Sequence, residues 1–218
     1  MALPHGIYAI VDSAAASRHG PLELVAAFVK GGAAVVQLRL KDTGAGELLR
    51  IAREAKAICA GHALLLINDR PDMAKLAQAD GVHLGQDDLP LAEARALLGP
   101  SAIIGISAHS DEELQAAQGA DYAGFGPIFA TRSKPGAALP LPHGLAGLRR
   151  AVQLSKVPLV AIGGLTAATA HEVAATGARC AAAIAELCGA ADPEAAVRAM
   201  AAAFGSSGRL PLAAGFSR

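Results

Sequence analysis

The sequence predicts a single compact (β/α)8 TIM barrel, a fold of the α/β class. Eight short apolar runs recur along the chain, and each is followed by an Ala-rich amphipathic stretch. The runs are apolar nearly throughout, which is typical of parallel strands buried on both faces. Eight such units within 218 residues fit one sizeable domain. An open doubly wound sheet is the alternative that the same alternation leaves open.

The expected strands are the eight apolar runs themselves: GIYAIV from Gly6, AVVQL from Ala34, LLLI from Leu64, GVHL from Gly81, IIGIS from Ile103, YAGF from Tyr122, PLVAI from Pro158 and AAAI from Ala181. The segments after them carry apolar residues at helical spacing. Asp111, Thr166 and Asp192 are the expected helix starts, and Gly119 and Gly177 the expected helix ends.

The barrel is expected to occupy residues 1–204 as a catalytic domain, with a flexible C-terminal tail over 205–218. The tail, GSSGRLPLAAGFSR, lacks the apolar periodicity of the preceding segments. A long loop rich in Pro and Gly, from Thr131 to Gly144, falls between the sixth strand and its helix. Loops of this length in compact domains are often lids, so we expect this one to be mobile without substrate.

Composition argues against several classes of partner. The formal net charge is zero, which argues against a nucleic-acid-binding face. No stretch approaches the ~20 apolar residues of a membrane span, and the first residues do not read as a signal peptide. The three Cys show no metal-type spacing, as expected of thiols in a reducing cytoplasm. The sequence leaves a homo-oligomer open.

Polar residues gather where the apolar runs end. The second run ends in Gln37, Arg39 and Lys41, whose alternation would place them on one face of a strand. The third ends in Asn68 and Asp69, and the fourth in the string GQDD with Asp87 and Asp88. Taken singly, these residues also fit a salt-bridged strand end and helix N-caps.

Taken together, the strand-end residues indicate a binding site. The carboxyl ends of barrel strands meet at one rim, where active sites of this fold lie. Adjacent strands would then deliver Asp69 and Asp88 to the same rim, and oxygen ligands without His or Cys favour Mg2+. Arg39, Lys41 and Lys134 on the predicted lid add positive charge. Two acids, a metal ion and several basic groups are suited to holding a diphosphate.

The remaining strand ends supply groups for anions. Ser107 ends the fifth run and could donate a hydrogen bond to an anionic oxygen. Gly163 and Gly164 end the seventh run, where backbone N–H groups commonly bind phosphate in this fold. His83 lies inside the fourth run and is expected in the barrel interior, whereas His109 is expected to be structural or solvent-facing.

The strings VVQLRLK, LLLINDR, ADGVHLGQDDLP, IIGISAHS, GADYAGFGPIFATRSK and PLVAIGGL resemble the thiamine phosphate synthase family, which also includes TenI-type thiazole tautomerases. The resemblance runs from Ile10 to about Leu187. It implies a transferase that joins 4-amino-2-methyl-5-(diphosphooxymethyl)pyrimidine to a thiazole phosphate, releasing pyrophosphate. The implied mechanism is dissociative and passes through a pyrimidine carbocation, so the thiazole nitrogen needs no general base.

The resemblance also implies a role for each matching residue. Mg2+ would bind Asp69 and Asp88. The pyrimidine diphosphate would be held by Gln37, Arg39, Lys41, Asn68 and Lys134, with Ser107 touching the pyrophosphate. The thiazole phosphate would face Thr131, Arg132 and Ser133, and its phosphate would be held by Gly164 and the backbone amides of Ile184 and Ala185. Leaving-group stabilisation would fall to Arg39, Lys41, Ser107 and Lys134.

Several positions depart from the family pattern. Leu40 replaces a common acid, Ala130 a usual Pro, and Ala185 a Ser, while Arg132 with Ser133 alters a T-x-T-like spacing. Arg179 and Cys180 replace Asp and Gly at the start of the eighth strand, far from the rim. Two alternatives therefore stay open: a tautomerase, although Pro127 stands where those enzymes carry a catalytic His, and a non-catalytic regulatory or binding member.

Overall fold

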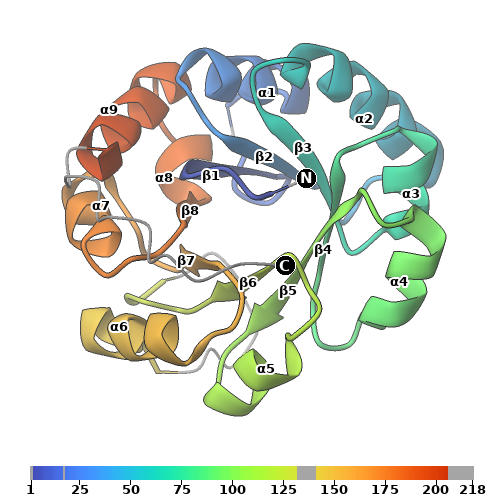
Figure 1. Ribbon diagram of the computed structural model, residues 1–218. Helices are drawn as coiled ribbons and strands as arrows, with labels where there is room; N and C mark the ends of the chain where they lie inside the picture. The colour runs from blue at the N-terminus through green and yellow to red at the C-terminus, as the bar shows by residue number, and fades with distance from the viewer. Residues whose placement is uncertain (1, 17, 132–140, 206–218) are drawn as a thin grey trace.

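The eight parallel strands of the computed structural model close into a barrel in chain order, with helices around the outside (Figure 1). The structure describes residues 2–16, 18–131 and 141–205. The strands are β1 (Gly6–Asp12), β2 (Val35–Arg39), β3 (Leu64–Asn68), β4 (Gly81–Leu84), β5 (Ile103–Ala108), β6 (Tyr122–Phe125), β7 (Leu159–Ile162) and β8 (Cys180–Ala183). Pairing of β8 with β1 closes the sheet, which confirms the predicted barrel and excludes the open doubly wound alternative.

The helices follow the predicted order, with one addition. They are α1 (Pro21–Lys30), α2 (Ala45–Cys59), α3 (Pro71–Leu76), α4 (Leu91–Leu98), α5 (Asp111–Ala116), α6 (Gly144–Leu154), α7 (Ala167–Ala174), α8 (Ala185–Cys188) and α9 (Pro193–Gly205). The addition is α8, a single turn directly after β8, which is too short to show a periodic pattern. Its first residue is Ala185, which directly follows the expected eighth run.

The helix boundary signals were mostly correct. Thr166 is the N-cap of α7, and the Asp192 side chain accepts from the Ala195 N–H at the start of α9. The helix α5 begins at Asp111 as expected, although its N-cap is the preceding residue, Ser110, whose Oγ accepts from the Glu113 N–H. Gly119 and Gly177 follow their helices with φ angles of 101° and 92°, a conformation that glycine adopts without strain.

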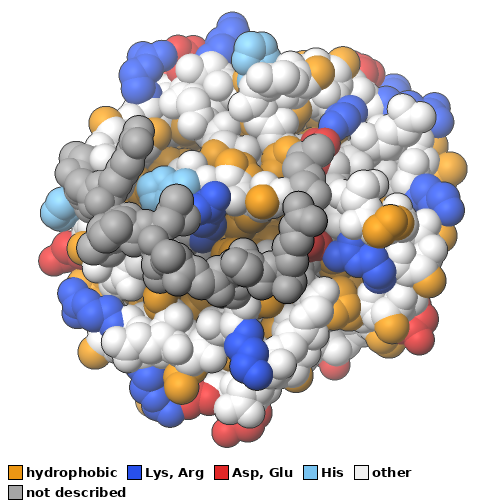
Figure 2. All heavy atoms as spheres, in the orientation of Figure 1, with side chains coloured by type: hydrophobic (Ala, Val, Ile, Leu, Met, Phe, Trp, Pro, Cys, Tyr) orange, Lys and Arg blue, Asp and Glu red, His pale blue; other side chains and the backbone are white. Residues whose placement is uncertain are grey.

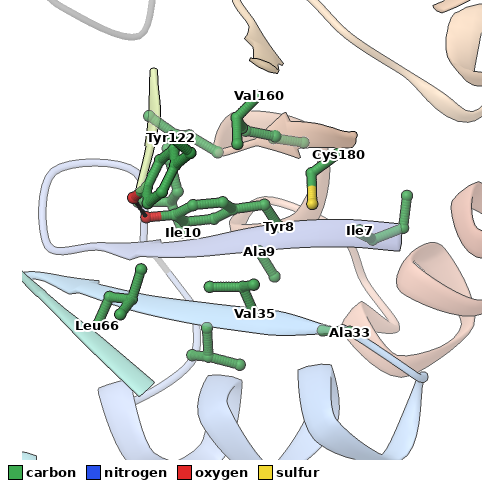
Figure 3. Close-up of a cluster of buried hydrophobic side chains, with 14 of the residues drawn as sticks. Ile7, Tyr8, Ala9, Ile10, Ala33, Val35, Leu66, Tyr122, Val160 and Cys180 are labelled. Carbon is green, nitrogen blue, oxygen red and sulfur yellow. Dashed lines mark hydrogen bonds between the residues drawn. The ribbon is translucent and has the colours of Figure 1, made fainter. Parts of the chain in front are cut away.

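Two large aromatic side chains occupy the middle of the barrel. Tyr8 and Tyr122 are fully buried, and Figure 3 shows their hydroxyl groups meeting across the interior. The ring of Tyr122 fits because β5 carries Gly105 beside it, where a Cβ would lie 2.0 Å from the tyrosine Cζ. The barrel centre is therefore packed around a polar contact.

The surface agrees with the balanced composition. Figure 2 shows basic and acidic side chains spread around the outline of the molecule, and the described residues on this face form no large patch of one sign. No helix in the described part of the chain is long and apolar enough to cross a membrane. Of the predicted tail, Gly205 closes α9, and residues 206–218 lie outside the described residues.

Candidate functional site at the strand ends

A buried ion pair fixes Arg39 at the ends of β1 and β2. Asp12 and Arg39 are register partners that close the two strands, and Arg39 Nη1 donates to Asp12 Oδ2. Asp12 is 1% exposed, and its Oδ1 also accepts from the Ala14 and Ala15 N–H groups at 2.8 and 3.1 Å. The carboxylate is therefore saturated, and it holds the guanidinium in one place.

The predicted metal ligands lie together beside a lysine. Lys41 Nζ is 3.2 Å from Asp69 Oδ2, and Asp88 Oδ2 accepts from the Gly85 N–H at 2.7 Å. Burial raises the pKa of Asp88, and the neighbouring Asp69 carboxyl raises it further, against the opposing effect of the Gly85 N–H. A carboxylate whose charge is disfavoured in this way is a group that a bound cation would stabilise.

Backbone geometry favours a binding role for these acids over helix capping. Asp69 has a φ of 60°, a left-handed conformation that is uncommon for residues other than glycine and is concentrated at functional sites. The N-cap of α3 is Arg70 and that of α4 is Pro90, and neither helix has a side-chain capping hydrogen bond. The alternative interpretation of Asn68, Asp69, Asp87 and Asp88 as helix N-caps is therefore wrong.

The other predicted diphosphate and pyrimidine residues come from neighbouring strands. Gln37 and Arg39 lie within β2, whereas Lys41 follows the strand and is 54% exposed. Asn68 ends β3 opposite His83 of β4, and Ser107 lies near the end of β5. The structure thus gathers the predicted groups from β2 to β5 on one arc of the rim.

Both histidines considered from the sequence lie where they were expected. The His83 ring is in the barrel interior, with Nδ1 2.9 Å from the Tyr122 hydroxyl and Nε2 3.0 Å from Ser107 Oγ. The Nδ1 atom of His109 is 2.7 Å from the Gly126 carbonyl oxygen, a structural contact.

The paired glycines after β7 are required by packing. Gly163 and Gly164 have φ angles of 99° and 67°. A Cβ on Gly163 would lie 2.6 Å from Pro127 Cα, and one on Gly164 would lie 2.5 Å from the Ala130 carbonyl oxygen. The glycines therefore let the 127–130 segment approach the end of β7, a role that the sequence analysis did not assign to them.

The amides predicted to bind phosphate lie at the start of α8. Ile184 is the N-cap of this helix, and Ala185 is its first residue. The first N–H groups of a helix have no partner within the helix, which leaves those of α8 suited to an oxyanion. The Ala167 N–H donates to Glu186 Oε1 at 3.4 Å, so the loop after β7 and the start of α8 are neighbours.

The predicted thiazole site extends beyond the described residues. Thr131 is half-buried after β6, while Arg132, Ser133 and Lys134 lie outside the described residues together with most of the predicted lid. The substituted residues at the start of β8 make hydrogen bonds to the segment before β1. Arg179 Nε donates to the Leu3 carbonyl oxygen at 2.9 Å, and the Cys180 thiol to that of Pro4 at 3.1 Å.

Sequence reasoning missed two sets of residues at this site. The first is Asp12. It ends the first apolar run, GIYAIVD, and an acid at the end of an apolar run is the same signal that revealed Asp69. Tyr8 and Tyr122 are the other, because an aromatic residue in an apolar run gives no sign that its hydroxyl faces a polar interior.

The chain has relatives of known name along most of its length. A sequence model of the family described as Thiamine monophosphate synthase matches residues 7–187. The thiamine-phosphate synthase of Anaeromyxobacter dehalogenans is 49% identical over 202 residues, which cover 91% of this chain and 87% of the relative. That of Moorella thermoacetica is 42% identical, over 88% of this chain and 92% of its own.

Solved structures agree with this assignment. Thiamine phosphate pyrophosphorylase from Pyrococcus furiosus superposes with a TM-score of 0.81 at 34% identity, covering 91% of this chain and 95% of that chain. A 3-hexulose-6-phosphate synthase superposes with a TM-score of 0.65 at 21% identity, which shows the barrel fold alone. With the family match spanning β1 to α8, the chain belongs to the thiamine monophosphate synthase family.

Proposed function

We propose that this chain joins the pyrimidine diphosphate to the thiazole phosphate, giving thiamine phosphate and pyrophosphate. The observation that carries the proposal is the arc of Arg39, Lys41, Asp69, Asp88 and Ser107 at one rim of the barrel, in a chain 49% identical to a thiamine-phosphate synthase. Departure of a diphosphate requires stabilised negative charge, and this arc offers both cations and carboxylates able to recruit a metal ion.

In this proposal each strand end has a separate task. Arg39, held by Asp12, and Lys41 bind the diphosphate oxygens, while Ser107 donates to the same group. Gln37 and Asn68 orient the pyrimidine ring. Because the thiazole nitrogen attacks as a neutral lone pair, the residues need only hold the two substrates in line and exclude water. No side chain has to remove a proton.

Mg2+ fits the donor set at the rim. Within the described residues no three His, Cys, Asp or Glu side chains form a metal cluster, so Asp69 and Asp88 would share the ion with diphosphate oxygens and water. When bound there, Mg2+ would neutralise charge on the departing diphosphate. Removing either carboxylate should therefore affect the leaving group more than pyrimidine recognition.

The second substrate is assigned to the opposite arc of the rim. Gly164 and the amides of Ile184 and Ala185 would bind the thiazole phosphate, beside Thr131, Arg132 and Ser133. Since the donors at α8 are backbone groups, Ala185 in place of the family's Ser is compatible with phosphate binding. Lys134, outside the described residues, keeps its sequence-based role at the diphosphate.

A metal titration tests this function. Purified protein is incubated with both substrates over a range of Mg2+ concentrations, and thiamine phosphate is quantified for wild type, Asp69→Asn and Asp88→Asn. We expect Mg2+-dependent product formation by wild type and at least about 100-fold slower turnover in each variant. Asp111→Asn, on α5, is a matched control and should retain activity. Failure of the wild type to form product at any Mg2+ concentration would refute the proposal.

A further inference from the structure

A continuous chain of hydrogen bonds crosses the interior of the barrel. Gln37 Nε2 donates to the Tyr8 hydroxyl at 2.7 Å, which is 2.8 Å from the Tyr122 hydroxyl. The Tyr122 hydroxyl is 2.9 Å from His83 Nδ1, and His83 Nε2 is 3.0 Å from Ser107 Oγ. The chain therefore links β2, β1, β6, β4 and β5, and its two ends are residues that the proposed function places on substrate.

The surrounding sequence makes room for this chain. A Cβ on Gly105 would meet the Tyr122 ring at 2.0 Å, and one on Gly124 would lie 3.1 Å from His83 Cε1. Figure 3 shows the hydroxyl ends of Tyr8 and Tyr122 turned toward each other among apolar side chains. Buried polar groups are costly unless each is hydrogen-bonded, and here successive members satisfy one another.

The donor at one end sets the direction of every bond. A carboxamide nitrogen only donates, so the Tyr8 oxygen accepts and its single hydrogen goes to Tyr122. On this count the Tyr122 hydrogen is left for His83 Nδ1, which can accept it only when that nitrogen carries no proton. Burial raises the pKa of both tyrosines, so each keeps the one hydrogen that this count requires.

We propose that Tyr8, Tyr122 and His83 are positioning residues, which hold His83 as the neutral Nε2–H tautomer and thereby aim the Ser107 hydroxyl hydrogen at the diphosphate. With Nε2–H donating to Ser107 Oγ, the serine's own hydrogen is left for an acceptor at the rim. The inference rests on the proposed function only for the identity of that acceptor.

Histidine NMR tests the tautomer without any substrate. Protein labelled with 15N-histidine is measured by long-range 1H–15N correlation near pH 7.5, and His83→Gln identifies the His83 signals. We expect a neutral ring protonated at Nε2. A ring protonated at Nδ1 would overturn the inference, because it would mean that every bond of the chain runs the other way. So would a doubly protonated ring.

Tyr122→Phe tests the effect on the reaction. The variant removes only the hydroxyl and keeps the ring beside Gly105. Losing one hydrogen bond that supports a charged leaving group should lower kcat about tenfold, with KM for the pyrimidine diphosphate little changed. Ser107→Ala should lower kcat similarly, and the double variant should be no slower than the single ones. Additive losses would overturn the inference.

Val160→Ala is the matched control. Val160 is a buried side chain of β7 in the same region, outside the chain of hydrogen bonds (Figure 3). It should lose stability and keep kcat, and an equal loss of kcat in this variant would show that Tyr122 acts through packing alone.

Tyr8→Phe is the second variant, to be used if Tyr122→Phe does not fold. It should give a mixture of His83 tautomers, and an unchanged tautomer in Tyr8→Phe would contradict the proposed direction of the hydrogen bonds. A wild type that makes no product but shows the expected tautomer would refute the proposed function alone.

Discussion

Gly164→Ala should destabilise the protein far more than an ordinary substitution at a loop glycine. Its φ of 67° is unfavourable for alanine, which costs about 1–2 kcal/mol at such a position. The added Cβ would also lie 2.5 Å from the Ala130 carbonyl oxygen and 2.9 Å from Phe129 Cβ. Forcing apart well-packed groups of this kind costs about 1–3 kcal/mol more. We therefore expect a loss of about 3 kcal/mol.

Gly61→Ala separates the two contributions. Gly61 has a φ of 76° but nothing within 4 Å of its Cβ position, so it carries the backbone strain without the clash. Urea unfolding of wild type and both variants gives the two losses of unfolding free energy. We expect Gly164→Ala to lose about 2 kcal/mol more than Gly61→Ala.

A displaced 127–130 segment should also affect substrate binding. In Gly164→Ala, KM for the thiazole phosphate should rise, while Gly61→Ala should leave it unchanged, because Gly61 follows α2 and lies outside the proposed site. Equal stability losses in the two variants would refute the close approach as the reason for this glycine.

Three further predictions concern ionisable groups. Asp12→Asn should destabilise the fold by about 2–3 kcal/mol and slow turnover, because Arg39 loses its buried counter-charge; unchanged urea unfolding and kcat would contradict this. Asp88→Asn should stabilise the metal-free protein at neutral pH. Because the pKa of Asp88 is raised in the folded protein, its ionised form lowers the free energy of unfolding, and Asn removes that cost. The gain in stability should shrink as the pH falls toward the usual carboxyl range. A difference in melting temperature between Asp88→Asn and wild type that stays constant from pH 4 to 8 would contradict this reasoning. Burial raises the thiol pKa of Cys59 and Cys180 to about 12 and that of Cys188 to about 11, so a thiol reagent at pH 8 should label none in the native protein and all three in denaturant; rapid native labelling would contradict the buried placement.

The fold could be predicted in detail because barrel strands carry a strong local signal. A strand buried on both faces must be apolar along its length, and each expected run begins within one residue of a strand in the structure. The short helix α8 could not be predicted, because one turn carries no periodicity. The cap at Ser110 was missed because Asp111, directly beside it, is an equally good capping residue.

The rim could be predicted from polar residues that end apolar runs, since the fold brings those ends together. Asp69, Asp88 and Lys41 were found this way. Membership of a family-like string does not separate site residues from structural ones. Asp80, within the family-like string ADGVHL, accepts from the Leu65 N–H and pairs with Lys56, so it serves the sheet. Contacts between distant strands, such as Tyr8 with Tyr122, depend on which side chains share the interior.

The most direct test is the stoichiometry of the reaction catalysed by purified wild-type protein with both substrates and Mg2+. Thiamine phosphate and pyrophosphate are quantified in the same samples over time, and each substrate is also incubated alone. We expect the two products to appear in a one-to-one ratio and only when both substrates are present. Pyrophosphate released from the pyrimidine substrate alone, or a changed thiazole phosphate with no thiamine phosphate formed, would contradict a coupling reaction at this rim.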